Sequence, residues 1–308
     1  MAKAAALKTD IRAVPPSGDT VVRTFAFAMR THPGRVRRAN QDACAAAPDH
    51  AAFVVCDGVG GAAGGEVASQ LAADSFLNAL RSSAKDSQSP HSRLHRAILA
   101  ANAAVFQRAQ RTRSLRGMAT TLVAALLEHP HRTTNDRVPH SYASISARTG
   151  GEHIDRRSDD GGCPTLWLAH AGDSRAYLFR DEADEQPATL RQLTTDHSLV
   201  EEQVRAGFLT PVDALRSPVR NVITRAIGSL PEVEPEIASH TIQPGDLYLL
   251  ASDGLTRELS DDAIAQILTT SGSNRSAAAL EAAADALIDA ANQHGGRDNI
   301  TVLLLACR

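Results

Sequence analysis

Residues 52–58 read Ala-Phe-Val-Val-Cys-Asp-Gly, a short apolar run that ends at an aspartate followed by a glycine. A run of this length, rich in β-branched and aromatic side chains, is typical of a buried strand. Similar strand-like runs occur at 25–29, 121–127, 165–169, 176–179, 247–251 and 300–306. This number of strands excludes an all-helical protein.

Helical periodicity appears between these runs. Apolar residues from Ala68 to Leu80 share one helical face, and those from Leu94 to Val105 share another. Two further helices are predicted at 261–269 and 276–293, before the last strand. Helices that arrive in pairs between groups of strands favour an α+β layered domain over alternating βαβ units.

Composition narrows the function classes. The chain has 308 residues, of which 43% are hydrophobic, enough for a sizeable core. Lys and Arg (32) nearly balance Asp and Glu (35), so no overall field favours nucleic acid or an anionic membrane. No apolar run approaches the roughly 20 residues that span a bilayer. Four cysteines without a CxxC pair predict reduced thiols and a cytoplasmic location: Cys44, Cys56, Cys163 and Cys307.

Two segments fall outside the periodic pattern. Residues 1–22 contain a Pro-Pro-Ser-Gly cluster and no charged leader followed by an apolar stretch, so a flexible N-terminal extension is expected before a domain at 23–308. Residues 128–164 are polar and lack sustained periodicity. We expect them to form an exposed insertion between two neighbouring strands.

Aspartates stand at the ends of three apolar runs. Asp57 and Asp253 each follow a run and precede a glycine, and Asp298 lies just before the last run. Clustered carboxylates repel one another, so a site built from several of them usually holds a hard divalent cation such as magnesium or manganese. Each position alone could be an ordinary turn. The glycine-rich stretch 57–65 could also cradle a nucleotide, but it lacks a Gly-Lys-Ser/Thr ending and a correctly spaced GxGxxG.

Seven motifs in order carry a resemblance to a known family. They are 34–42 (GRVRRANQD), 57–61 (DGVGG), 117–122 (GMATTL), 171–177 (AGDSRAY), 193–198 (LTTDHS), 252–255 (SDGL) and 296–299 (GRDN). With these motifs the chain resembles the metal-dependent protein phosphatases (PPM, type 2C), especially the bacterial serine/threonine phosphatases. The resemblance implies a four-layer α-β-β-α sandwich, in which helix pairs flank two antiparallel β-sheets and a metal cleft lies at one end.

The resemblance also implies a metal centre with two Mn²⁺ or Mg²⁺ ions. Asp57 would bridge the ions, with the Gly58 carbonyl on one and Asp253 and Asp298 on the other. Asp173 matches the ligand of a weaker third ion in bacterial relatives. Residues that would support these ligands from behind are Asp42, Gln41 and Asn299.

The activity implied by the resemblance is hydrolysis of phosphoserine and phosphothreonine in proteins. A metal-bridging water would attack phosphorus without a phosphoenzyme. Arg37 matches the arginine that clamps the phosphate, for which its planar fork is suited. The implied partners are phosphorylated proteins and a bacterial serine/threonine kinase that the enzyme opposes, and the chain would act as a monomer. Residues 199–228 match the family's flap segment, which helps to select substrates.

Some positions depart from the family pattern. Gln41 replaces a common glutamate, which removes one negative charge near the second metal. Val59 stands where relatives carry histidine or methionine and has no proton to donate; His197 is one alternative donor, or a structural residue. Ala62 replaces a histidine that is usual in bacterial relatives. These departures leave open a pseudophosphatase that binds phosphoproteins without turnover. A sporulation- or sigma-factor-type phosphatase would usually add sensor or membrane modules.

Overall fold

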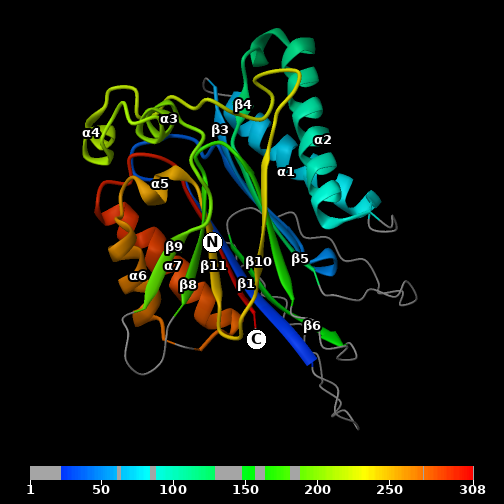
Figure 1. Cartoon of the computed structure of the whole chain (residues 1–308), viewed down its shortest axis with the longest axis vertical. Coiled ribbons are helices and arrows are strands. Elements are labelled where there is room, and N and C mark those ends of the chain that lie inside the picture. The colour runs from blue at the N-terminus through cyan, green and yellow to red at the C-terminus, as the bar shows by residue number, and fades with distance from the viewer. Residues whose placement is uncertain are drawn as a thin grey trace, which may run out of the picture.

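The computed structural model describes residues 22–60, 64–83, 88–128, 148–156, 164–180, 188–272 and 274–307. Two six-membered groups of strands form two antiparallel sheets (Figure 1). The first sheet has the order β6-β1-β12-β11-β8-β9. Its strands are β6 (Arg148–Arg156), β1 (Val22–His32), β12 (Ile300–Cys307), β11 (Leu247–Ala251), β8 (Arg175–Arg180) and β9 (Thr189–Gln192).

The second sheet has the order β10-β7-β5-β3-β2, and a two-residue strand, β4, pairs with the end of β3. Residues 42–47 pair with 52–57, so Asp42 lies opposite Asp57. The strands are β10 (Glu236–Thr241), β7 (Thr165–Ala171), β5 (Leu122–Glu128), β3 (Ala52–Val59), β2 (Asp42–Ala47) and β4 (Ala119–Thr120).

Alternating side chains divide the interior into three layers of packing. Phe53 lies between the two sheets, where it contacts the ring of Phe25 edge-on at 5.7 Å between centroids. Its neighbour Val54 points the other way, toward the helices that cover the second sheet. Period-two alternation of this kind, with both faces apolar, explains why the central strands read as continuous hydrophobic runs.

Helices cover the outer face of each sheet. The pair α1 (Gly64–Ser82) and α2 (Pro90–Arg111) packs on the second sheet. The pair α6 (Asp261–Thr270) and α7 (Ala277–Gln293) packs on the first (Figure 1). Serine side chains cap α2, α6 and α7 by accepting a backbone N–H three residues on, which fixes where these helices begin.

Short helices complete the chain. The single turn α5 (Asp253–Thr256) follows β11, and α3 (Leu199–Arg205) and α4 (Pro211–Arg216) lie in the predicted flap segment. In the described part of the chain, 3-10 turns are formed by Pro48–His50 and Arg113–Leu115. Within the described residues, no helix is both long and apolar enough to cross a bilayer.

The predicted α+β class with two antiparallel sheets is confirmed, and the seven strand-like runs and four periodic helices lie where the pattern placed them. Strands β2, β4, β6, β9 and β10 were not predicted. Strand β6 lies inside the segment 128–164 that was expected to be an exposed insertion, and it pairs with β1. The flanking strands β5 and β7 are direct neighbours. Residues 129–147, 157–163 and all but the last residue of the expected extension 1–22 lie outside the described residues.

Candidate metal centre

The backbone of Asp57 is fixed by two threonines of the third motif, Thr120 and Thr121. The Thr121 N–H and the Thr120 hydroxyl both donate to the Asp57 carbonyl oxygen at 2.8 Å. The Asp57 N–H in turn donates to Thr121 Oγ1 at 2.9 Å. Strand β3 therefore presents the Asp57 side chain from a rigid frame rather than from a loose turn.

Asp42 faces Asp57 from the neighbouring strand and is held by the opposite sheet. The hydroxyls of Ser252, at the end of β11, and Thr301, on β12, each donate to Asp42 Oδ2 at 2.7 Å. The carboxylate is buried, with 9% of the residue exposed. These two bonds lock one oxygen of Asp42 and leave the other toward the carboxylate cluster.

Three more carboxylates reach the same place from other elements. Asp253 begins α5, Asp298 lies two residues before β12, and Asp173 lies in the turn between β7 and β8. Arg257, one helical turn after Asp253, forms an ion pair with that residue and a second one with Asp173, at 3.3 Å. A single guanidinium therefore offsets part of the negative charge of two aspartates.

The electrostatics show that the carboxylates are close together. Burial, followed by the charges of Asp42 and Asp253, raises the pKa of Asp57 well above its ordinary value. Burial raises the pKa of Asp173 to about 7, with the charge of Asp253 as the next cause. Burial is also the main reason that the pKa values of Asp42 and Asp253 rise to about 6. Such a cluster favours either protons or a cation.

The donor set fits divalent cations. One buried oxygen each of Asp42, Asp173 and Asp253 accepts no hydrogen bond from an N–H or hydroxyl group in the described part of the chain. Buried acceptors without partners are costly, and a hard cation satisfies them. All the side-chain donors in the cluster are carboxylate oxygens, which suit magnesium and manganese.

Two glycines allow the backbone to approach the cluster. A Cβ atom on Gly58 would overlap the carbonyl oxygen of Gly65, so no side chain is accommodated there. The position of a Cβ on Gly65 would lie 2.7 Å from the Gly58 carbonyl oxygen and 3.0 Å from Gln41 Oε1. The Gly58 carbonyl oxygen and Gln41 Oε1 therefore face the same space beside Gly65. Gly58 directly follows Asp57 in the chain.

Asn299 shapes the loop that carries Arg37. Its side-chain amide donates to Pro33 O at 3.0 Å and Ala39 O at 2.9 Å, and its Oδ1 accepts from the Gln41 N–H at 2.8 Å. Arg37 Nη2 donates to Asp298 Oδ2 at 2.8 Å. The Arg37 side chain is 53% exposed, so it stands at the edge of the cluster and reaches solvent.

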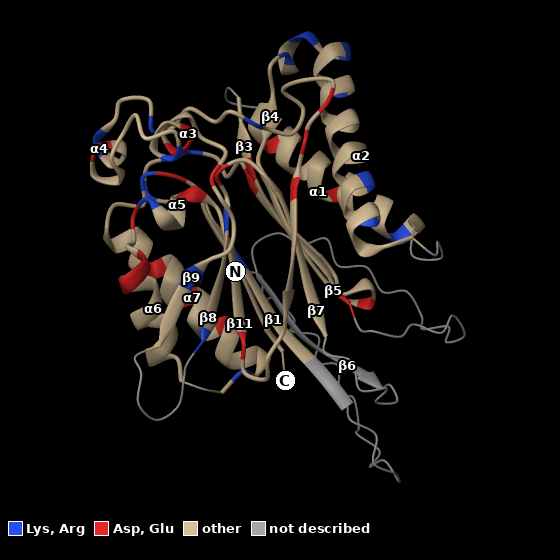
Figure 2. Cartoon of the chain, viewed as in Figure 1, with Lys and Arg blue, Asp and Glu red and all other residues tan. Residues whose placement is uncertain are grey.

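A cleft of about 900 Å³ opens above the cluster. Asp173, Asp253 and Asp298 line it together with Arg37 and Arg257, and Asp57 and Asp42 lie outside its lining. The opposite wall comes from the predicted flap, through α3, α4 and the loop after them. Figure 2 shows acidic and basic residues gathered around α5 and α3, at this end of the sheets.

Comparison with known proteins identifies the family. Two family models described as "Protein phosphatase 2C" match residues 34–134 and 154–300. A serine/threonine phosphatase of Listeria monocytogenes, stp, is 31% identical over 282 residues, which cover 90% of this chain and 94% of that protein. The chain belongs to the protein phosphatase 2C family.

Other members of the protein phosphatase 2C family agree with this assignment. Protein phosphatase PhpP of Streptococcus pneumoniae is 41% identical over 138 residues, 45% of this chain and 51% of its own. The crystal structure of Mycobacterium tuberculosis PstP/Ppp has a TM-score of 0.69 at 31% identity and covers 92% of this chain and 98% of its own. A structure of the PstP catalytic domain with two manganese ions has a TM-score of 0.67 at 31% identity, covering 92% and 99%.

The predicted family, on its bacterial serine/threonine phosphatase branch, is thus confirmed. The structure brings together the side chains of Asp57, Asp253, Asp298, Asp173 and Asp42, with Gly58 and Gln41 beside them. Asn299 lies behind Asp298, whose Oδ1 accepts the Asn299 N–H at 2.9 Å.

Sequence reasoning missed the basic residue of this protein phosphatase 2C site and the hydroxyls that hold Asp42. Arg257 pairs with two of the carboxylates, and its spacing of four residues from Asp253 was the available signal. The Val59 side chain, which has no proton to donate, is 42% exposed. His197 is buried and does not line the cleft, which removes it as a direct proton donor there. Ala62 lies outside the described residues.

Proposed function

We propose that this bacterial-type serine/threonine phosphatase removes phosphate from phosphoserine and phosphothreonine of proteins at the carboxylate cluster, with two Mn²⁺ or Mg²⁺ ions and a weaker third. The observation that carries the proposal is the cluster itself: buried carboxylates with raised pKa values, of which Asp173 and Asp253 have unpartnered oxygens and line an open cleft. The metal cleft at one end of the four-layer sandwich then corresponds to this region.

We assign each proposed ligand to one of the ions or to both. Asp57 would contact both, the Gly58 carbonyl one of them, and Asp253 with Asp298 the other. Asp173 would hold the third ion. When bound, such ions activate a water nucleophile as Lewis acids and offset negative charge on the phosphoryl oxygens. Asp42, Gln41 and Asn299 hold the ligands and the loop in place.

Arg37 binds and orients the phosphate. Its pairing with Asp298 occupies Nη2, and a planar guanidinium has further N–H groups for two phosphoryl oxygens. The burial of part of the side chain against the cluster limits the directions that the fork can take. Positioning the phosphoester against the carboxylate floor is therefore the role of Arg37, rather than proton transfer.

The proton for the leaving oxygen does not come from residue 59, because valine has none. Among the described residues, the cleft is lined by no histidine. Asp173 has a pKa of about 7, but its carboxylate would be ionised when it holds a metal ion and would then have no proton to donate. We assign the protonation step to solvent that enters the open cleft.

The cleft geometry favours proteins as substrates. One wall is a flap of short helices with exposed apolar side chains, including Leu215 at 76% exposure, beside arginines. A phosphorylated loop of a folded protein could lie between this wall and the cluster. We propose that residues 23–308 act as one cytoplasmic, monomeric domain that opposes a serine/threonine kinase, without nucleic acid or membrane partners.

A peptide assay tests the proposal. Purified protein is incubated with a phosphothreonine peptide and Mn²⁺, Mg²⁺ or chelator, and phosphate release is measured. Turnover that requires the ion and disappears in Asp57→Ala, with an unfolding temperature that shows an intact fold, is the expected result. Mn²⁺ binding by calorimetry without turnover would instead support the pseudophosphatase.

A further inference from the structure

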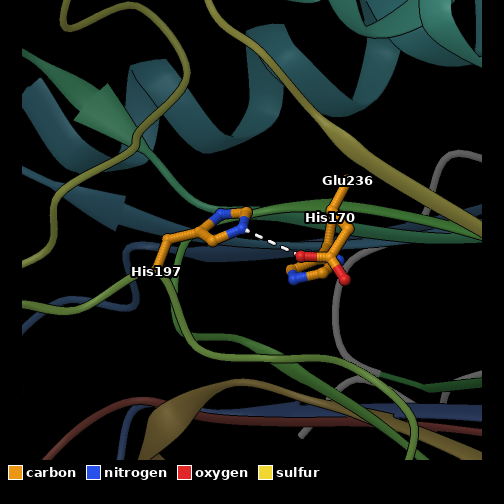
Figure 3. A group of neighbouring side chains, drawn as sticks. All are labelled: His170, His197 and Glu236. Atoms are coloured by element: carbon orange, nitrogen blue, oxygen red, sulfur yellow. Dashed lines mark ion pairs between the residues drawn. The ribbon is translucent and has the colours of Figure 1, made fainter. Parts of the chain in front are cut away.

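Two histidines and a glutamate form a second cluster, outside the carboxylate floor (Figure 3). His170 comes from β7, His197 from the loop before α3, and Glu236 from the start of β10. Both histidines are buried, with 3% and 4% exposure, and their rings stack 4.6 Å apart at 11°. His197 Nε2 lies 3.5 Å from Glu236 Oε2.

The residue types resemble a metal site, but the geometry does not. Imidazole lone pairs lie in the ring plane, so an ion about 2.0–2.1 Å from both nitrogens cannot lie in two nearly parallel, stacked planes. The Gly172 N–H donates to His197 Nδ1, which requires the neutral ring to carry its proton on Nε2. Arg225 Nη1 lies 3.3 Å from Nε2 and brings a positive charge there; because both nitrogens carry hydrogen in this tautomer, they do not form a hydrogen bond with each other.

The cluster is better described as a hydrogen-bond network that fixes the His197 ring. Nε2 faces Glu236 as a donor, and the ring is stacked on His170, whose own Nε2 donates to Thr195 O at 2.8 Å. Burial, followed by the charge of His170, lowers the pKa of His197 to about 4. The ring is therefore neutral at physiological pH, and Nδ1 is free to accept.

We propose that His197 is a positioning residue for Asp173, holding the turn that carries this carboxylate; the inference rests on the proposed role of Asp173 as ligand of the third ion. His197 makes two bonds to the residue just before Asp173. Its N–H donates to Gly172 O at 2.9 Å, and its Nδ1 accepts from the Gly172 N–H at 3.2 Å. The two bonds fix both backbone polar groups of Gly172, its N–H and its carbonyl oxygen.

The turn needs such support. Gly172 has a φ of +120°, and a Cβ there would lie 2.6 Å from the side chain of Thr121, so the backbone passes close to its neighbour in a conformation that only glycine adopts easily. Asp173 is repelled by Asp253, and its buried Oδ1 accepts no hydrogen bond within the described residues. Arg257 holds Oδ2 at 3.3 Å, and the position of Oδ1 then depends on how firmly the backbone of the turn is held.

His197 also touches the flap. Its carbonyl oxygen accepts the Thr224 N–H at 2.8 Å, and the next residue, Ser198, forms an isolated bridge with Ile223. The same residue thus joins the Asp173 turn to the last part of the 199–228 segment. The Thr224 and Ile223 contacts use only the backbone, and the one side-chain contact with the flap, Arg225 Nη1, lies at the Nε2 edge. Loss of the Nδ1 edge alone should therefore affect Asp173 before it affects the flap.

Two conservative substitutions separate the two edges of the ring. In His197→Asn, the amide oxygen takes the place of Nδ1 and can accept from Gly172. In His197→Gln, the longer amide reaches the Nε2 position and can donate to Glu236, but the acceptor at Nδ1 is lost. His240→Gln is the matched control, since His240 lies on β10 outside the cluster and its buried Nε2 has no partner among the described residues.

The readout is Mn²⁺ binding by calorimetry, with Asp173→Asn as the reference for a missing third site and thermal unfolding as the check on folding. We expect His197→Asn and His240→Gln to bind as the wild type does. His197→Gln should keep the tight phase and weaken the weak phase about tenfold or more, the range for residues that orient ligands.

Three outcomes would overturn the proposal. The first is a wild-type weak phase in His197→Gln. The second is an equal loss in His197→Asn and His197→Gln, which would indicate packing rather than the Nδ1 bond. The third is a wild-type titration without a weak phase, because Asp173 would then hold no ion. Failure of the proposed function is distinct from all three: it is the absence of metal-dependent phosphopeptide hydrolysis in the wild type.

Discussion

Replacing Asp253 by asparagine should stabilise the metal-free protein while it removes the activity. The carboxyl of Asp253 is buried beside other carboxyls, and burial raises its pKa from an ordinary 3.8 to about 6 even though Arg257 acts in the opposite direction. That rise corresponds to about 3 kcal/mol of destabilisation when the group is forced to ionise in the folded state. Asparagine has a similar shape, stays neutral and keeps an oxygen for Arg257.

The sign follows from linkage. Because the folded pKa lies above the unfolded one, the neutral form contributes stability that is complete below pH 3.8 and lost as the pH rises through about 6. The advantage of Asp253→Asn should therefore be absent near pH 4 and complete at pH 8. For 308 residues, about 3 kcal/mol corresponds to about 5 °C in the unfolding temperature.

The assay is thermal unfolding in chelator and in Mn²⁺, at pH 4.5 and pH 8. In chelator at pH 8 the variant should unfold about 5 °C above the wild type. In Mn²⁺ the wild type should gain stability by ligand binding, about 2.7 kcal/mol at a hundredfold excess over the dissociation constant, and the variant much less. The difference between the two unfolding temperatures should then disappear or change sign.

Asp246→Asn is the control for this experiment. Asp246 is also fully buried, but it is paired with Arg180 at 2.8 Å and accepts from the Tyr248 hydroxyl and the Gln243 N–H. Its replacement should lower the unfolding temperature with or without Mn²⁺. The reasoning about Asp253 is wrong if Asp253→Asn unfolds below the wild type in chelator at pH 8, or if its advantage is as large at pH 4.5.

Three further predictions concern the frame of the site. Arg37→Ala should raise the KM for a small aryl phosphate about tenfold to a hundredfold, the loss of charge-assisted hydrogen bonds, while Mn²⁺ affinity measured by calorimetry stays unchanged; a collapse of metal binding would instead make Arg37 a support for Asp298. Asn299→Ala removes three bonds to the 33–41 loop and should lower the unfolding temperature by about 5 °C and raise the KM, whereas an unchanged KM would show that the loop holds itself. Gly58→Ala should abolish Mn²⁺ binding or soluble expression because its Cβ overlaps Gly65 O, and wild-type binding would refute the close approach.

The strands that the sequence revealed are those buried on both faces. Strands β3, β5, β11 and β12 lie inside the sheets, so nearly every residue is apolar and the run is visible without knowledge of the fold. Strand β2 was missed because its residues after Asp42 are mostly alanine, which has little preference for strands. It becomes a strand through its pairing with β3.

Edge strands were invisible for a different reason. Strand β6 reads Arg-Thr-Gly-Gly-Glu-His-Ile-Asp-Arg, and β10 reads Glu-Ile-Ala-Ser-His-Thr, so neither carries an apolar run. Each is extended because one neighbour, β1 or β7, supplies the hydrogen bonds. Pairing of this kind depends on contacts between residues more than 60 positions apart, which no local window contains.

The candidate site divides in the same way. Asp57, Asp253 and Asp298 were found because each stands where an apolar run begins or ends. The hydroxyls of Ser252 and Thr301 were not, because their bonds to Asp42 arise only when the two sheets are stacked. Sequence therefore locates the proposed ligands at strand ends, whereas their supports follow from packing across the sandwich.

The placement of the supports explains how a stable fold tolerates so much buried negative charge. Hydroxyl donors from Ser252 and Thr301 stabilise one oxygen of Asp42, and Arg257 offsets Asp253 and Asp173, yet the pKa values of all three aspartates stay raised. The negative charge of the cluster is thus only partly offset. This remaining charge is needed for function, since a fully neutralised cluster would have no affinity for a cation. The apolar packing between and outside the sheets must supply the remaining stability, and the residual repulsion at the floor of the cleft is what a divalent ion removes on binding.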